Sequence, residues 1–152
     1  MKYRRLTKDE LESLTDEFVK FMIVNGIDAK EWLRIKGDEP VKAIQMIDLF
    51  SDFIFDGIVR KVKNIDYFDE AGVKLFKCDE DVIHLISIES DKPVKKVEDW
   101  EEIIQSKSKS CTFIRTSKAY KPDRNTEIFR MIRAGGNISD GKWFETIAGG
   151  FD

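Results

Sequence analysis

The chain has 152 residues, of which 41% are hydrophobic and 36% charged, and its net charge is −3. These values indicate one globular domain, residues 1–152, and exclude a disordered chain. No run approaches the roughly 20 apolar residues that a membrane span needs. The basic N-terminus precedes no apolar stretch with a cleavage site, and there are only two cysteines. We therefore expect a cytoplasmic protein with reduced thiols and no contact with a membrane.

Charge is unevenly distributed along the chain. Residues 1–102 carry 17 Lys/Arg and 24 Asp/Glu, whereas residues 103–152 carry 9 and 5. An acidic first part and a basic last part predict surfaces of opposite sign, each able to meet a complementary partner.

The first part of the chain, about residues 7–63, is predicted to be a three-helix unit. A capping box at Thr7–Glu10 starts a first helix, and Asn25-Gly26 ends it. Asp28 caps a short second helix that ends near Gly37. Pro40, in a first-turn position, begins a third helix that continues to Lys63.

The third helix, Pro40–Lys63, is the stretch around which we expect the fold to be organised. Its apolar residues cover more than half of the helix circumference, which predicts burial with partners on several sides. One narrow polar stripe remains, formed by Gln45, Asp48, Asp52 and Asp56.

The second part, about residues 64–152, is predicted to contain a three- to four-stranded antiparallel sheet. Runs rich in β-branched and aromatic residues predict strands over 63–69, 73–78, 82–89 and 111–116. A helix is predicted over 97–106, and a C-terminal helical hairpin turns at Gly135-Gly136. The fold class is therefore α+β. The sequence leaves open whether the two parts share one core.

The aspartate stripe is the first candidate site. Asp48, Asp52 and Asp56 are one helical turn apart, so they could hold a hard cation or receive a partner's basic side chains. The favoured interpretation is a solvated or partner-contacting stripe, because no second set of ligands faces it in the sequence. If Arg4, Arg5 or a basic C-terminal residue folds back onto Asp52, the stripe is instead a structural ion-pair seam between the two halves of the chain.

The second candidate is the basic segment 107–133, which we interpret as a partner-binding surface. Aromatic residues interleave with its cations, so single-stranded nucleic acid is the alternative partner. A solvated strand edge guarded by lysine would give the same composition. The cations of the segment are Lys107, Lys109, Arg115, Lys118, Lys121, Arg124, Arg130 and Arg133.

The third candidate is a thiolate–imidazole site made by Cys78, His84 and Cys111. All three lie on predicted strands, but their spacing has no zinc-finger pattern. We favour two buried thiols and a hydrogen-bonded histidine over a metal site or a nucleophile. The sequence also has no phosphate loop, dinucleotide fingerprint, nucleophile elbow or metalloprotease motif, so we expect no cofactor, no metal and no catalytic residue.

Short stretches across most of the chain resemble a family of short uncharacterised bacterial proteins, a domain of unknown function. The resemblance implies a bacterial cytoplasmic protein and assigns no activity or site residue. The stretches are Met1–Thr7, Val24–Ile27, Leu49–Asp52, Arg60–Val62 and Ile138–Gly141 with Phe144.

The sequence as a whole favours a non-enzymatic interaction module, an accessory subunit of a larger assembly with a protein partner. Two alternatives remain open. One is a nucleic-acid-associated factor that uses segment 107–133, and the other is a small metal-dependent enzyme that uses the aspartate stripe. A flat apolar patch with a charged rim would favour a protein partner. A continuous basic groove would favour nucleic acid, and a concave pocket beside Asp52 or His84 would favour an enzyme.

Overall fold

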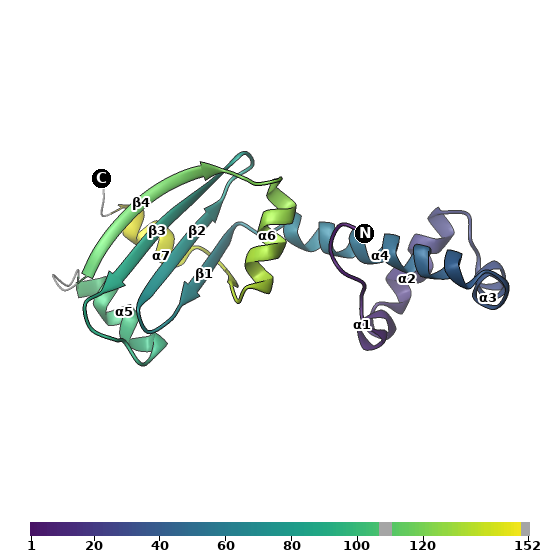
Figure 1. Ribbon diagram of the computed structural model, residues 1–152, viewed down its shortest axis with the longest axis horizontal. Coiled ribbons are helices and arrows are strands. Elements are labelled where there is room, and N and C mark those ends of the chain that lie inside the picture. Colours follow the sequence, from purple (N-terminus) through teal and green to yellow (C-terminus); the bar gives the residue numbers. More distant parts are fainter. Residues whose placement is uncertain (107–110, 150–152) are drawn as a thin grey trace. The chain divides into compact units, whose positions relative to one another are not determined.

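The computed structural model describes residues 1–106 and 111–149, and the chain forms two compact units, residues 1–58 and 59–152. Unit 1 contains α1 (Lys8–Ser13), α2 (Thr15–Val24), α3 (Ala29–Asp38) and most of α4 (Pro40–Arg60). The last two residues of α4 belong to unit 2, which carries the sheet (Figure 1). The predicted α+β class and the N-terminal helical unit are confirmed.

The predicted first helix is divided in two at Leu14. The capping box at Thr7 forms as expected, with Glu10 as its partner. At Leu14 the backbone leaves the helical region (φ −110°, ψ 24°). The hydroxyls of Ser13 and Thr15 flank this residue, and each donates to a carbonyl three residues earlier. Such local bonds compete with the helical ladder, which explains a break that hydrophobic spacing did not predict.

Unit 1 has a small aromatic core between α2, α3 and α4. The ring of Phe18 lies 5.2 Å from that of Trp32 and 5.0 Å from that of Phe50, in edge-to-face geometry. Gly26 ends α2 at a φ of 77°, which glycine adopts without strain, and the chain then turns so that Ile27 is buried. These contacts fix α2 and α3 against α4.

The apolar side of α4 is less buried than its composition predicted. Phe50 and Ala43 are buried, yet five of its large apolar side chains are exposed: Val41, Ile44, Leu49, Phe53 and Ile58. The helix therefore presents an apolar surface as well as a core face. No helix in the described part of the chain is both long and apolar enough to span a bilayer.

Unit 2 is built on one antiparallel sheet with the strand order β4-β3-β2-β1-β5 (Figure 1). The first three strands agree with their predicted ranges to within one residue at each end, and the fourth continues three residues past its predicted end at 116. The fifth, β5, was not predicted and makes the sheet one strand wider than expected. The strands are β1 (Asn64–Phe68), β2 (Gly72–Cys78), β3 (Val82–Ser90), β4 (Cys111–Ala119) and β5 (Asn137–Ser139).

Strand β5 lies between the two C-terminal helices, where we expected only a turn. It has three residues and pairs Ile138 with Ile65 of β1. The preceding Gly136 packs against β1, because a Cβ there would lie 2.7 Å from the Ile65 side chain. A pairing this short and this distant in sequence leaves no periodic pattern to detect.

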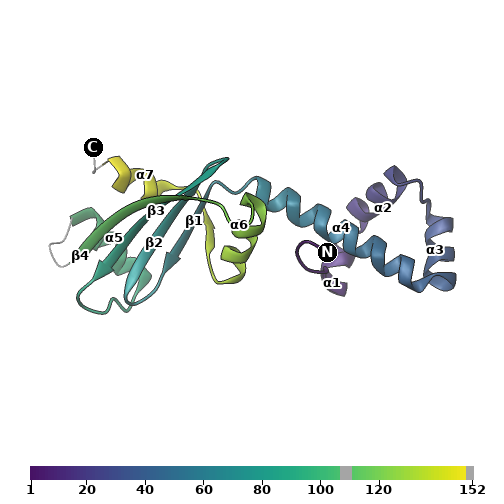
Figure 2. The same cartoon turned by 45° about the horizontal axis from the view of Figure 1, so that its top comes forward.

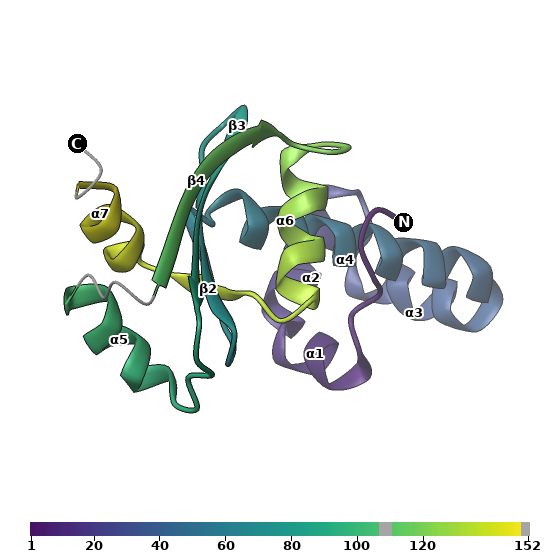
Figure 3. The ribbon, with the colours of Figure 1, turned by 60° about the vertical axis from the view of Figure 1, so that its left-hand side comes forward.

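Helices cover both faces of the sheet in unit 2 (Figure 3). One face packs on α5 (Val97–Ser106) and α7 (Lys142–Gly149), with Trp100 and Phe144 buried against Leu75 and Ile86. The opposite face carries α6 (Arg124–Arg133), where the Tyr67 hydroxyl donates to the Met131 carbonyl. Asp123 caps α6 by accepting from the Thr126 N–H at 2.9 Å.

Candidate functional site

The aspartate stripe of α4 is covered by the N-terminal segment, residues 2–6, which runs beside the helix (Figure 2). Asp52 accepts from the backbone N–H groups of Lys2 (2.7 Å) and Tyr3 (3.0 Å). The adjacent residue Ser51 is buried, and its hydroxyl accepts from the Leu6 N–H at 3.0 Å. The backbone of the N-terminal segment is thus held against α4 within unit 1.

The other two aspartates of the stripe also have donors from this segment. Arg5 reaches Asp48 with two hydrogen bonds, at 2.6 and 3.1 Å, and this pairing lowers the pKa of Asp48. The Tyr3 hydroxyl and the Lys2 ammonium both contact Asp56. N–H and cationic donors occupy the carboxylates and would repel a metal ion, so the stripe is an ion-pair seam within unit 1. Among the residues described, no group of three or more His, Cys, Asp or Glu side chains could hold a metal.

The structure disperses the basic segment. Lys107 and Lys109 lie outside the described residues. Arg115 is paired with Ile86 in the β3–β4 register and so shares the α5/α7 face, whereas Lys118, three residues on, points to the α6 face and pairs with Glu127. Lys121, which precedes α6, is exposed, as are Arg130 and Arg133 on that helix. The described cations form no single stripe along one groove.

Arg124, one of the predicted partner-binding residues, binds the chain's own backbone. Its guanidinium donates to the carbonyls of Val59 (3.1 Å) and Val62 (2.5 Å), at and beyond the C-terminal end of α4. It also donates to the carbonyls of Cys78 and Asp79, both at 3.2 Å, where β2 ends. Carbonyls at a helix end carry partial negative charge, so a guanidinium satisfies them well. Arg124 therefore joins α6 to the C-terminal ends of α4 and β2.

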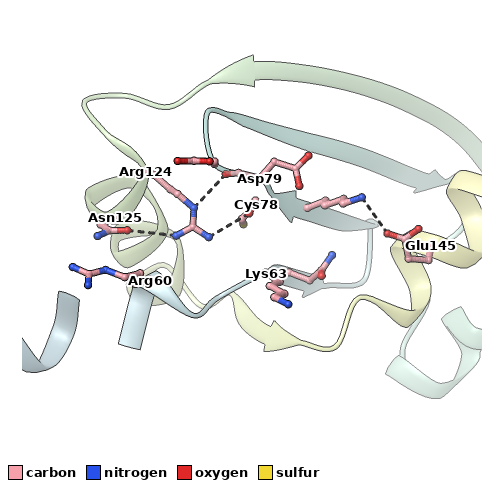
Figure 4. A pocket seen from close by; sticks show the side chains of 10 residues that line it. Arg60, Lys63, Cys78, Asp79, Arg124, Asn125 and Glu145 are labelled. Carbon is pink, nitrogen blue, oxygen red and sulfur yellow. Dashed lines mark hydrogen bonds and ion pairs between the residues drawn. The ribbon is translucent and has the colours of Figure 1, made fainter. Parts of the chain in front are cut away.

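A hollow of about 620 Å³ opens beside Arg124 in unit 2 (Figure 4). Lys77 and Glu145 in its wall form an ion pair at 3.4 Å. Among the described residues, Arg60 and Lys63 have no side-chain partner. The wall carries both positive and negative side chains, so its charge favours neither an anionic nor a cationic ligand. Its lining is Arg60, Lys63, Asn64, Lys77, Cys78, Asp79, Glu80, Arg124, Asn125 and Glu145.

Cys78, His84 and Cys111 do not converge. Cys111 is paired with Ser90 at one end of the β3–β4 ladder, whereas Cys78 is paired with Ile83 near the other end of β3. Cys78 is buried, and desolvation raises the pKa of its thiol to about 11, so it is a poor nucleophile.

Both ring nitrogens of His84 are hydrogen-bonded. Nδ1 lies 2.6 Å from Ser117 Oγ, and Nε2 lies 3.0 Å from Asp79 Oδ2. Hydrolytic triads contain the same three groups, but Ser117 is exposed here on the outermost strand β4. In hydrolases the serine of a triad lies in a pocket that holds the substrate beside donors for the developing oxyanion. The geometry agrees with a hydrogen-bonded histidine, the interpretation that the sequence favoured.

The surface that sequence reasoning missed is an apolar groove of unit 1. A hollow of about 620 Å³ lies between the α2–α3 loop and α4, with the apolar side chains of Ile27, Met46 and Leu49 in its wall. Leu49 is 56% exposed, and Phe53, one turn further along α4, is 58% exposed and contacts the Phe21 ring. The complete lining, which we call the unit 1 groove, is Asn25, Gly26, Ile27, Asp28, Glu31, Ile35, Lys42, Met46 and Leu49.

Exposed apolar side chains concentrate in unit 1. Of the twelve large hydrophobic side chains exposed in the described residues, ten belong to unit 1 and two, Ile114 and Ile138, to unit 2. A signal for this was available in the sequence. Residues 41–62 hold more apolar side chains than one core face of a helix can bury.

Comparison with known proteins identifies the family. The chain matches, over residues 1–151, the model described as "Family of unknown function (DUF6495)". It belongs to this family. Neither the curated proteins nor the solved structures contain a match to the chain. The family agrees with the resemblance seen in the sequence, and it assigns no activity.

Proposed function

We propose that the protein is a non-enzymatic interaction module that binds a partner protein through the unit 1 groove. The observation that carries this proposal is the exposure of Leu49 and Phe53 beside the hollow that Met46 and Ile27 line. Contiguous apolar surface with a charged rim is typical of protein-binding sites. Asp28, Glu31 and Lys42 supply the rim here.

The groove fits one class of occupant, an amphipathic helix. It lies alongside α4, whose residues Lys42, Met46 and Leu49 line it at helical spacing, the last two apolar. A partner helix would place an apolar stripe of i, i+3 or i+4 residues in such a groove. Unit 1 has nine Lys/Arg and twelve Asp/Glu, so Lys or Arg on the flanks of the partner helix would be favoured.

The test is capture of partners from the native cell by the tagged full chain, in three versions. These are the wild type, Leu49→Glu and the matched control Ile138→Glu. Ile138 is 55% exposed, close to the 56% of Leu49, but lies in unit 2. Placing a charge in an apolar contact costs several kcal/mol, so we expect capture to fall more than about tenfold for Leu49→Glu only.

Capture alone would not support the proposal. The captured protein must contain a segment that, as a synthetic peptide, binds the wild type and becomes helical when it does so. Capture that Leu49→Glu leaves unchanged would contradict the proposal. So would capture that nuclease abolishes, which would favour the nucleic-acid alternative. Binding of a second copy, or of unit 2 of the same chain, at the groove would also contradict it.

A further inference from the structure

Strand β4 is the outer edge of the sheet in unit 2, opposite the short edge strand β5 (Figures 1 and 2). It pairs with β3 over nine consecutive residues, Cys111–Ala119, without a bulge. Within the described ranges, the β4 backbone has no hydrogen-bonded neighbour on its other side. Alternate N–H and C=O groups of a nine-residue edge are therefore available to another strand.

Natural edge strands are usually protected against pairing, and β4 has little of that protection. Proline, bulges, short length, a covering helix and charged side chains are the common devices. β4 contains no proline and no bulge. It has two cations, and one of them, Lys118, is taken by Glu127 of α6. Ile114 is 49% exposed at the middle of the strand. An edge with these properties is suited to strand addition.

We propose that β4 is a self-association edge, at which two copies of this chain pair their β4 strands antiparallel. A twofold axis perpendicular to the sheet would pass between the Ile114 residues of the two copies. Such an interface uses the same surface on both copies, so it closes as a dimer. This surface is in unit 2 and is independent of the unit 1 groove.

The register about Ile114 is chosen by the side chains that it brings opposite one another. Ile114 meets Ile114 of the second copy, so an exposed apolar side chain on each β4 is covered. Phe113 of each copy lies opposite Arg115 of the other, on the face that carries α5 and α7. Thr112 lies opposite Thr116. Apolar, cation–aromatic and threonine pairs are each favourable across strands.

Of the two neighbouring registers with the same symmetry, the one centred on Arg115 is worse. Centred on Arg115, it would place two guanidinium groups directly opposite one another, and like charges there are destabilising. Arg115 has no ion-pair partner among the described residues that could offset this repulsion. In the Ile114 register, by contrast, each Arg115 has an aromatic ring opposite it.

The test is disulfide cross-linking of the purified full chain under mild oxidation, with Ile114→Cys and Thr112→Cys compared. Residues directly opposite in an antiparallel pair have Cα atoms about 4.5 to 5.5 Å apart, which a disulfide can bridge. In the proposed register the thiols of Ile114→Cys face each other. Those of Thr112→Cys are offset by four residues, roughly 13 Å along the strands, and serve as the matched control.

We expect a covalent dimer from Ile114→Cys and none above the wild-type background from Thr112→Cys. Equal cross-linking of the two variants, or none from Ile114→Cys, would overturn the proposal. A second measurement needs no added thiol. Sedimentation should show a wild-type dimer, and Ile114→Lys, which sets like charges opposite each other, should weaken association by about tenfold or more. Wild type that stays monomeric as its concentration rises would also overturn it. Leu49→Glu should not change either result, which separates this proposal from the groove.

Discussion

The carboxylate of Asp52 receives the backbone N–H of Tyr3 at 3.0 Å, across 49 residues of sequence. Together with the neighbouring hydrogen bonds, it makes the aspartate stripe, the first candidate site of the sequence, part of the framework of unit 1. The stripe holds the N-terminal segment in place, while the apolar groove on another part of α4 stays open. The arrangement predicts different consequences for mutations on the two surfaces of one helix.

Removing the Asp52 carboxylate should release the N-terminal segment. In Asp52→Ala the N–H groups of Lys2 and Tyr3 lose their acceptor. We expect these two amides to exchange with deuterium much faster than in the wild type, and unit 1 to lose about 1 kcal/mol of stability. The matched control is Asp16→Ala on α2, an exposed acid, which should leave exchange at residues 2 and 3 unchanged. Equal exchange in Asp52→Ala and the wild type would contradict the assignment.

The ion pair between Arg4 and Glu10 should make unit 1 sensitive to acid. Hydrogen bonds from Arg4 and, to a smaller extent, from Thr7 lower the pKa of Glu10 from 4.5 to about 2. A carboxyl whose pKa is lower in the folded state stabilises the fold above its unfolded pKa, and that contribution disappears as pH falls towards 2. Glu10→Gln keeps an acceptor for the Thr7 cap but loses the charge. Its melting temperature should therefore lie below that of the wild type at neutral pH and converge with it near pH 2.

A suitable control for Glu10→Gln is Glu12→Gln on the same helix. Glu12 is exposed, and among the residues described its carboxylate has no partner. Its substitution should leave the melting temperature close to the wild-type value at each pH. A melting-temperature difference for Glu10→Gln that stays constant between neutral pH and pH 2 would exclude the Arg4 pairing as its cause.

Arg124 should be a structural residue rather than a partner contact. Arg124→Lys keeps the charge, but a single ammonium cannot span the carbonyls of Val62 and Cys78 as the guanidinium does. We expect a loss of about 3 kcal/mol in the unfolding free energy of unit 2, measured by denaturant titration with tryptophan fluorescence. The control is Arg130→Lys, an exposed position on the same helix, which should change stability by less than about 0.5 kcal/mol. Equal stabilities of the two variants would contradict this role.

The two cysteines should differ in reactivity. Cys78 is buried and its pKa is raised to about 11, whereas Cys111 is only half-buried at the start of β4. Iodoacetamide should therefore modify Cys111 first, and Cys111→Ser should remove almost all of the fast labelling. Fast labelling that persists in Cys111→Ser and disappears in Cys78→Ser would show that Cys78 is the reactive thiol.

Elements with local signals were predictable from the sequence. The capping residues Thr7 and Asp28 start helices where expected, and the four longer strands follow alternating runs of β-branched residues. The range 97–106 predicted for α5 agrees with the structure. What failed depended on tertiary context. The break at Leu14 and strand β5 both follow from particular hydrogen bonds and pairings that leave no periodic pattern.

The sequence identified the residues of the candidate sites but not the contacts that these residues make. A cation near Asp52 was anticipated, yet the donors to that carboxylate are backbone N–H groups, which a sequence does not distinguish. The sequence identifies Arg124 as a basic residue, but its four carbonyl acceptors lie at the ends of α4 and β2, far from it in sequence. The apolar excess of α4 was visible, and only the structure shows which side chains it leaves exposed.

The central claim, that the unit 1 groove binds a partner helix, is tested most directly by photo-cross-linking in the native cell. A photoreactive phenylalanine analogue would be placed at position 49 in one strain and at position 138 in another. We predict that position 49 cross-links to an amphipathic helical segment of another protein and that position 138 does not. Cross-links from position 49 only to the chain itself, or the same products from both positions, would contradict the claim.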